Sequence, residues 1–213
     1  MFTGIIQAKG SIHEVHPSEK GAVLVINSDD LDLADSNVGD SIAVNGVCLT
    51  ATKLKKNFFT ADVSQETLSC TTFSELTEGQ HVNLEKSLRL NQGIDGHLVS
   101  GHVDGVGEVC SVYSEGESTR LKIKVMTDLM KYIAKKGSIC INGVSLTVNG
   151  VAGNIFDVNI VPHTLSATTL GDLNEKSKVN LEIDIIARHL EQLINHKIDS
   201  GVDLSALDKN EHL

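Results

Sequence analysis

The segments Ser41-Ile-Ala-Val-Asn-Gly-Val-Cys-Leu-Thr50 and Ser138-Ile-Cys-Ile-Asn-Gly-Val-Ser-Leu-Thr147 lie 97 residues apart and are identical at most positions. In each, an Asn-Gly pair stands between two runs of β-prone residues. Both central positions of the tightest hairpin turn need positive φ, which Asn and Gly tolerate. Each segment therefore predicts a β-hairpin, and the second is a copy of the first.

The same offset aligns the rest of the two halves. About twenty of the 47 positions from 41 to 87 are identical 97 residues later, where chance gives about three or four. Gly4 and Gly10 fall on Gly101 and Gly107. Two copies of about 90 residues are too few and too long for a solenoid, whose units need several neighbours to bury their faces. We therefore expect two similar globular halves.

Each half has the pattern of short strands. Alternating runs at residues 121–125 and 156–160 indicate half-buried strands. Six or so such strands with Gly and Asn turns are typical of a small closed barrel, which leaves no open edge. Short helices are expected over residues 66–76 and 163–173, and the segment 91–96 is the natural connector.

The pattern changes after the second copy ends near Asp184. An apolar stripe at helical spacing follows, formed by Ile185, Ile186, His189, Leu190, Leu193 and Ile194. The stripe either packs on the second barrel or is buried against copies of itself, and the pattern favours neither. From Ser200 onward small and polar residues dominate, so we expect a mobile tail.

Composition excludes several classes of protein. The net charge of −10 and the absence of Trp argue against a nucleic-acid binder, which needs a basic face and often aromatic platforms. No apolar run is long enough for a membrane span, and the amino end lacks a signal-peptide layout, so we expect a cytoplasmic protein. The cysteines (Cys48, Cys70, Cys110 and Cys140) lack metal spacing and are expected to be reduced thiols, so no metal site is predicted.

Several short motifs recur in order along the doubled chain. They are Met1-Phe-Thr-Gly-Ile5, Asn45-Gly-Val-Cys-Leu-Thr50, Gln65-Glu-Thr-Leu68, Gly96-His-Leu-Val-Ser-Gly-His102, Asn142-Gly-Val-Ser-Leu-Thr-Val148, Pro162-His-Thr-Leu165 with Thr168-Thr169, and Asn180-Leu-Glu-Ile-Asp184. Each motif alone is a weak signal. Together they resemble the riboflavin synthase family over residues 1 to about 190.

The resemblance implies an all-β fold of two six-stranded Greek-key barrels plus a C-terminal α-helix. The implied domains are an N-terminal lumazine-binding barrel at 1–90, a C-terminal one at 91–187, and a trimerisation helix with a flexible tail at 188–213. It further implies a homotrimer that uses 6,7-dimethyl-8-ribityllumazine as both donor and acceptor of a four-carbon unit, without a separate cofactor. Paired barrels would suit a reaction between two copies of one molecule.

The positions at which the halves differ are candidates for chemistry. Cys48 matches Ser145, and His102 matches Ile5. A thiolate could add to an electron-poor ring carbon, and an imidazole could shuttle a methyl proton. By resemblance, Cys48, His102, Ser41, Asp184 and Thr147 are the candidate catalytic residues, where the amino half of one chain meets the carboxy half of a neighbour. The alternatives are a buried core thiol for Cys48 and a surface or capping histidine for His102.

A ribityl chain and a pyrimidine ring call for hydroxyls, carboxylates and free backbone groups around an apolar slot. We expect a first-half set of Gly4, Ile5, Ile6, Cys48, Leu49, Thr50, Asp62, Val63, Ser64, Gln65, Glu66 and Thr67. We expect a second-half set of Gly101, His102, Val103, Lys136, Ser145, Leu146, Thr147, Val161, Pro162, His163, Thr164, Leu165 and Ser166. For any single hydroxyl, ordinary strand solvation explains it equally well, and Lys136 and Asp184 are alternatively plain surface charges.

Two positions depart from the commonest family pattern, Asp95 and Ala51, and neither removes a proposed reacting group. His97 is interpreted as a structural residue of the linker. The main rival function is a carrier that holds lumazine or flavin without converting it, because the fold alone does not separate enzyme from carrier. A third possibility is a duplicated barrel adaptor that binds no ligand.

Overall fold

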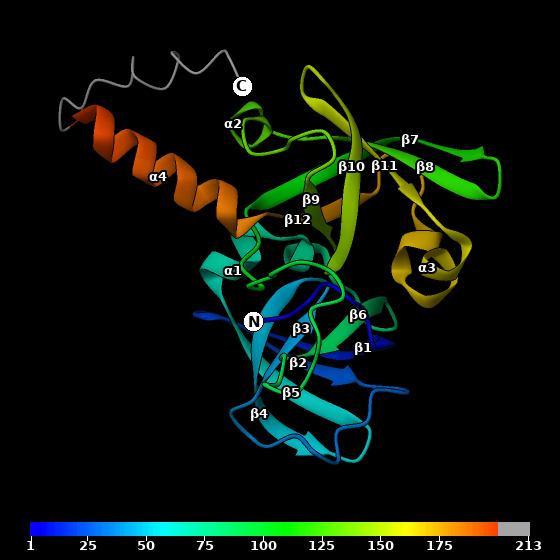
Figure 1. The fold of residues 1–213 in the computed structure, drawn as a ribbon. Coiled ribbons are helices and arrows are strands. Elements are labelled where there is room, and N and C mark those ends of the chain that lie inside the picture. Colours follow the sequence, from blue (N-terminus) through cyan, green and yellow to red (C-terminus); the bar gives the residue numbers. More distant parts are fainter. Residues whose placement is uncertain (200–213) are drawn as a thin grey trace, which may run out of the picture.

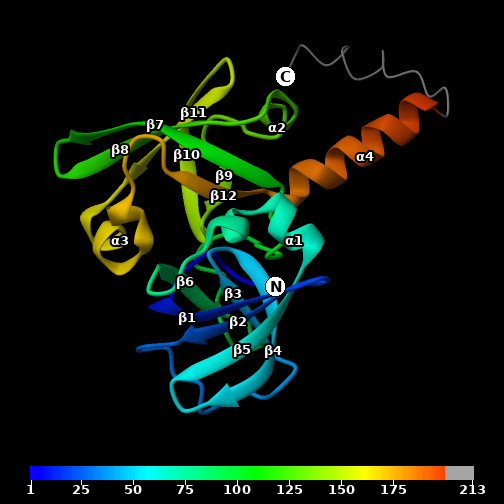
Figure 2. The same ribbon diagram turned by 180° about the vertical axis from the view of Figure 1, so that it is seen from behind.

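The computed structural model describes residues 1–199 as two closed antiparallel barrels, one stacked on the other (Figures 1 and 2). The first barrel contains β1 (Ala8–Ser18), β2 (Gly21–Asn27), β3 (Ser41–Val44), β4 (Val47–Lys55), β5 (Phe58–Ser64) and β6 (His81–Lys86). The second contains β7 (Gly105–Glu115), β8 (Ser118–Lys124), β9 (Ser138–Ile141), β10 (Val144–Ala152), β11 (Ile155–Ile160) and β12 (Lys178–Ile183). The neighbour order is β1-β2-β5-β4-β3-β6 in the first barrel, and the corresponding strands follow the same order in the second. The predicted fold class is confirmed.

The two Asn-Gly hairpins form as expected. Asn45 and Gly46 have φ of 44° and 79°, and Asn142 and Gly143 have φ of 47° and 84°. Alternate side chains of the strands point into two separate apolar cores, in which Phe59 and its repeat counterpart Phe156 are fully buried. Each half therefore has its own core, as a duplicated domain requires.

Asparagine side chains join the two barrels at their junction. The Asn83 Nδ2 donates to the Asn142 carbonyl at 2.9 Å, and the Asn180 Nδ2 donates to the Asn45 carbonyl at 2.9 Å. Within each barrel, the Asn45 and Asn142 side chains accept from the backbone N–H groups of Asn83 and Asn180, both at 2.8 Å. These paired bonds relate the halves by a local twofold axis.

The hairpin turns meet at the same junction. A Cβ added to Gly46 would lie 2.7 Å from the backbone nitrogen of Gly143, and one added to Gly143 would lie 2.9 Å from that of Gly46. A side chain at either position would therefore push the barrels apart, so glycine is needed for contact as well as for the positive φ.

Helices form at both predicted places, 66–76 and 163–173, but each is broken into two pieces, so only the predicted extent is wrong. The pieces are α1 (Gln65–Cys70) with the 3₁₀-helix η1 (Thr72–Glu75), and α3 (Pro162–Ala167) with η2 (Thr169–Asp172). Thr71 and Thr168 lie between them in extended conformation, with φ of −130° and −132°. Each hydroxyl donates to a carbonyl of the preceding helix and accepts from a backbone N–H of the next. A threonine thus ends one helix and caps the other.

Helix α4 (Ile185–Asp199) runs outward from the junction, away from both barrels (Figures 1 and 2). Ile186, Leu190, Leu193 and Ile194 of its apolar stripe are 49–61% exposed. The alternative in which the stripe packs on the second barrel is therefore wrong. Side chains of the second half hold the helix by polar contacts of Glu191 with Lys131 and Tyr132. The expected mobile tail from Ser200 lies outside the described residues.

A short helix, α2 (Thr127–Met130), precedes β9 and was not predicted. Within residues 1–199, no helix has the length and apolar character needed to cross a membrane. The same residues hold no cluster of three or more His, Cys, Asp or Glu side chains suited to a metal ion.

Candidate functional site

Two segments outside the barrels cross at the junction; we call residues 1–6 the first arm and residues 98–103 the second arm. Phe2 and Val99 pair in an antiparallel bridge. The Phe2 N–H donates to the Val99 carbonyl at 2.7 Å, and the Val99 N–H donates back to the Phe2 carbonyl at 3.1 Å. Both side chains are buried, and they pack with Ala43 and Cys140 in a small cluster between the barrels. The arms are therefore fixed parts of the fold.

A buried carboxylate holds each arm. Glu85 accepts from the Thr3 N–H and hydroxyl, both at 2.7 Å, and from the Gly4 N–H at 3.1 Å. Glu182 accepts from the Ser100 N–H and hydroxyl and from the Gly101 N–H, at 2.5–2.9 Å. Burial raises the pKa of both carboxyl groups, and the hydrogen bonds oppose that rise. The two glutamates lie 97 residues apart, so the repeat offered a signal that the sequence analysis did not use.

Each arm then lies on the barrel of the other half. The Cys48 N–H donates to the Gly101 carbonyl at 2.8 Å, and the Ser145 N–H donates to the Gly4 carbonyl at 2.7 Å. Both glycines have positive φ, and a Cβ on either would lie about 2.5 Å from the Cβ of Cys48 or Ser145. Val103 accordingly packs on the first core. Only glycine permits so close an approach.

This exchange corrects the grouping expected from the sequence. Gly4, Ile5 and Ile6 were assigned to the first half, yet Gly4 bonds β10 and Ile6 packs on the second core. Gly101, His102 and Val103 were assigned to the second half, yet they lie against β4 of the first barrel. The 97-residue offset shows which residues are equivalent, but it does not show on which barrel each arm packs. Because the arms cross, each packs on the barrel of the other half.

The other predicted residues of the first half gather at one end of its barrel. Strands β4 and β5 are antiparallel neighbours, so the start of β4 lies beside the end of β5 and the start of α1. Cys48 is half-buried there, and Ser41 pairs with Thr50 across β3 and β4. The side chains of Leu49 and Val63 point into the core. The remaining ones, mostly exposed, are Asp62, Ser64, Gln65, Glu66 and Thr67.

Ser64 has a structural role as well. Its hydroxyl accepts from the Thr67 N–H at 3.1 Å and caps α1. Val161 stands at the equivalent place and gives no side-chain cap, but Pro162 follows at the first helical positions. Both helices therefore start at the ends of matched strands.

The second half repeats the arrangement. Strand β10 carries Ser145, Leu146 and Thr147, and Thr147 pairs with Ser138 of β9. The residues that follow β11 form the turn into α3 and its helix, namely Val161, Pro162, His163, Thr164, Leu165 and Ser166. Gly4, Ile5 and Ile6 of the first arm complete this set. Ile5 is 44% exposed, in the place that matches the exposed His102.

Lys136 and Asp184 lie outside the strands. Lys136 has φ of 68° in the loop before β9, and its N–H donates to the Val148 carbonyl at 2.7 Å. Its side chain is exposed. The Asp184 carboxylate accepts from the Ile186 N–H at 3.0 Å at the start of α4. Asp184 therefore has a helix-capping role whatever else it does.

Sequence reasoning missed His97. Its Nδ1 lies 2.7 Å from the Ser145 hydroxyl, so the linker histidine reaches the second residue set. Its only signal in the sequence is a place inside the Gly96-to-His102 motif.

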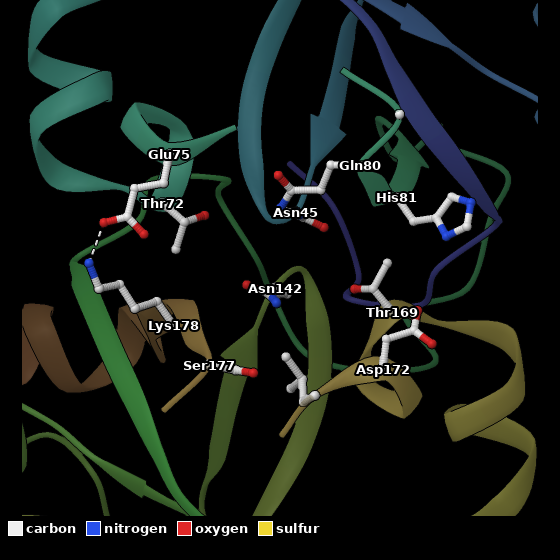
Figure 3. Close-up of a pocket in the computed structure, with 12 residues that line it drawn as sticks. Asn45, Thr72, Glu75, Gln80, His81, Asn142, Thr169, Asp172, Ser177 and Lys178 are labelled. Carbon is white, nitrogen blue, oxygen red and sulfur yellow. Dashed lines mark hydrogen bonds and ion pairs between the residues drawn. The ribbon is translucent and has the colours of Figure 1, made fainter. Parts of the chain in front are cut away.

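A separate hollow of about 540 Å³ lies between the barrels (Figure 3). Matched residues of both halves line it, among them Thr72 and Thr169, and Glu75 forms an ion pair with Lys178 across it. None of the predicted substrate residues contributes to its lining. The hollow is therefore distinct from both residue sets.

Two barrels of the same topology with exchanged arms define a duplicated domain. The lumazine binding domain family matches residues 3–87 and again residues 100–184. The chain belongs to the lumazine-binding family of riboflavin synthases.

Three relatives named riboflavin synthase illustrate this membership. The one from Photobacterium leiognathi is 48% identical over 199 residues, covering 93% of this chain and 90% of that protein. The one from Photobacterium phosphoreum is 47% identical and covers 100% of both chains. The one from Bacillus subtilis is 38% identical, covering 98% of this chain and 96% of that protein.

Solved structures of LumP are also similar. LumP complexed with 6,7-dimethyl-8-(1'-D-ribityl) lumazine aligns with a TM-score of 0.77 at 29% identity, over 86% of this chain and 99% of that one. LumP complexed with riboflavin aligns with a TM-score of 0.79 at the same identity and coverage.

Proposed function

We propose that this chain is a riboflavin synthase. It transfers a four-carbon unit between two molecules of 6,7-dimethyl-8-ribityllumazine and yields riboflavin and 5-amino-6-ribitylaminouracil, with no separate cofactor. The observation that carries the proposal is the 38–48% identity to riboflavin synthases over nearly the whole doubled chain. A domain present twice suits a reaction in which one compound is both donor and acceptor.

Each lumazine binds at the end of one barrel. The first binding set consists of Cys48, Leu49, Thr50, Asp62, Val63, Ser64, Gln65, Glu66 and Thr67 with Gly101, His102 and Val103 from the second arm. The second consists of Lys136, Ser145, Leu146, Thr147, Val161, Pro162, His163, Thr164, Leu165 and Ser166 with Gly4, Ile5 and Ile6 from the first arm. Hydroxyls at both helix starts, with the carboxylates of Asp62 and Glu66 in the first set, suit ribityl hydroxyls, and the apolar strand residues suit the ring.

Five residues carry the proposed chemistry. The Cys48 thiol adds to an electron-poor ring carbon, and His102 moves a methyl proton. The bond from the Cys48 N–H to Gly101 supports this pairing, because His102 is the next residue along the second arm. Ser41, which pairs with Thr50 of β4, and Thr147, which pairs with Ser138 of β9, supply hydroxyls. Asp184 accepts from a hydroxyl or steadies a proton transfer.

The working enzyme is a homotrimer held together by α4. The exposed apolar stripe on this helix supports the proposal, since exposed apolar surface of this kind marks interaction sites. In the trimer, the first barrel of one protomer faces the second barrel of a neighbour, and the two lumazines meet between them. All four cysteines are free thiols, which suits a cytoplasmic location.

Incubation of the purified chain with the lumazine alone tests the function. We expect one riboflavin and one ribitylaminouracil for every two lumazines consumed, followed by absorbance and chromatography. The similarity to LumP makes a carrier the second candidate. A carrier would change the lumazine emission on binding without forming riboflavin, and an adaptor would leave both emission and absorbance unchanged.

A further inference from the structure

The His97 ring is fixed beside the second binding set. Its Nδ1 lies 2.7 Å from the Ser145 Oγ, and its backbone N–H donates to the Thr3 carbonyl at 3.1 Å. The residue is 9% exposed. Gly96 allows this placement, because a Cβ there would lie 2.1 Å from the Thr3 carbonyl oxygen and 2.9 Å from the Ser145 Cβ. The linker, the first arm and β10 therefore hold one imidazole against one hydroxyl.

The second ring nitrogen is buried and unused. Within residues 1–199, no hydrogen-bond partner of the His97 Nε2 is found. Burial lowers the pKa of His97, and the nearby Asp184 carboxylate opposes this. The ring is therefore neutral around pH 7, with one nitrogen as donor and the other as acceptor. A buried polar atom without a partner is costly, and such atoms in native proteins often have a functional role.

The two halves differ at this point. Ser145 matches Cys48, and each donates its backbone N–H to a glycine of an arm. The Ser145 side chain has a histidine partner, whereas the hydrogen bonds of the described residues include none from the Cys48 thiol. The imidazole next to Cys48 along the second arm, that of His102, is exposed. The segment 97–102 thus places an exposed imidazole, that of His102, beside the first binding set and a buried one, that of His97, beside the second; neither has a histidine counterpart in the first repeat.

We infer that His97 is a positioning residue of the second binding set. A serine hydroxyl rotates freely, and its proton takes the direction of its strongest partner. In either tautomer the bond to His97 holds the Ser145 rotamer, so the remaining hydrogen-bonding capacity of the Oγ faces the lumazine bound there. This inference rests on the proposed synthase function. It adds a hydrogen bond, that of His97 with Ser145, which distinguishes the second lumazine site from the first.

A double-mutant cycle on His97 and Ser145 tests the inference. The variants are His97→Leu, Ser145→Ala, the double variant and His97→Asn, whose amide keeps a polar atom near the Nδ1 position. Each is assayed for kcat and KM with the lumazine. We expect His97→Leu and Ser145→Ala each to lower kcat about tenfold, as the loss of one hydrogen bond predicts, with KM within about twofold. The double variant should fall no further than Ser145→Ala.

Rescue and controls separate positioning from folding. His97→Asn should recover most of kcat, and His13→Asn on the exposed face of β1 should match the parent chain. Thermal unfolding of every variant reports stability, and if His97→Leu does not fold, His97→Asn/Ser145→Ala completes the cycle. Additive losses, or equal losses in His97→Asn and His97→Leu, would overturn the inference. Absence of riboflavin formation by the parent chain would overturn the synthase proposal and this inference together, whereas parent turnover with an unchanged His97→Leu rate overturns this inference alone.

Discussion

Cys48 and Ser145 occupy matched positions in the two halves, but the side chains themselves differ. Both donate a backbone N–H to a glycine carbonyl, so the strand starts have the same shape. Their side chains differ in reactivity, because a cysteine sulfur is intrinsically a better nucleophile than a serine hydroxyl. The two barrels thus share one backbone arrangement at this position, and a single substitution gives only the first a thiol.

The change Cys48→Ser tests the thiol directly. It keeps the size and the backbone bond to Gly101 but removes the better nucleophile, so we expect turnover to fall by roughly tenfold or more. Lumazine binding should change by less than about threefold. Steady-state kinetics and fluorescence titration measure the two quantities. An unaltered rate would leave Cys48 a packing role.

His97 also predicts a pH dependence of stability. Burial places its folded-state pKa below the ordinary 6.5. As the pH falls, His97 therefore takes up a proton in the unfolded chain before it does so in the folded chain. Its contribution to the free energy of unfolding is present above about pH 6.5 and is lost as the pH falls toward the folded-state pKa. The slope is at most about 1.4 kcal/mol per pH unit.

Urea unfolding at several pH values between 5 and 8 measures this slope. His97→Asn should lose the corresponding part of the slope, and His13→Asn should keep it. Equal slopes in the parent chain and His97→Asn would contradict the assignment.

At the scale of elements, asparagine side chains connect the barrels alongside the apolar cluster of Phe2, Ala43, Val99 and Cys140. Asn83 and Asn180 each bond the opposite hairpin turn and accept from the first N–H of the opposite 3₁₀-helix, at Thr169 and Thr72 respectively. Each side chain thus satisfies backbone groups of the other half. The junction is specific because every bond has a fixed direction.

Asn180→Ala should destabilise the chain by about 2 kcal/mol or more, because it leaves the Asn45 carbonyl and the Thr72 N–H without their partners. Asn83→Ala should have a similar effect for the matched reason. Denaturant unfolding measures both. Asn57→Ala, at an exposed turn position, is the control and should change stability by less than about 0.5 kcal/mol.

The strands and turns were predicted from the sequence more accurately than the contacts between distant segments. The Asn-Gly turns, the alternation of the strands and the repeat were enough for two closed barrels. The breaks at Thr71 and Thr168 were missed because threonine tolerates both a helix and a cap. The residues of each arm were grouped with the half that contains them, although the resemblance already placed His102 with Cys48. His97 was interpreted as a structural residue of the linker. The packing of the arms and the bond of His97 to Ser145 depend on contacts that no local pattern encodes.

At the scale of the whole molecule, one helix projects with its apolar side exposed. Polar contacts join it to the rest of the chain, such as the ion pair of Arg188 with Asp104. An isolated protomer would therefore leave four large apolar side chains in water. Association through α4 removes them from water.

Removal of residues 186–213 should yield a monomer that has lost turnover, because the proposed site spans two protomers. Light scattering gives the mass, and the lumazine assay gives the activity. The far-ultraviolet circular dichroism of the strands should persist, since both cores lie before residue 186.

Leu190→Glu in the full-length chain is the matched test of the stripe. It should likewise shift the mass toward the monomer, while Gln192→Glu on the same helix should not. Full turnover by a monomeric truncation would contradict the shared-site arrangement.

The crossing of the arms limits how this protein can be divided. If either half were produced by itself, it would lack the glycine-bearing strip that lies on its own barrel. It would have to obtain that strip from a second molecule, and the free energy of that association would depend on the protein concentration. In the fused chain the donor is permanently tethered, so the strip is supplied at a high effective molarity even at high dilution.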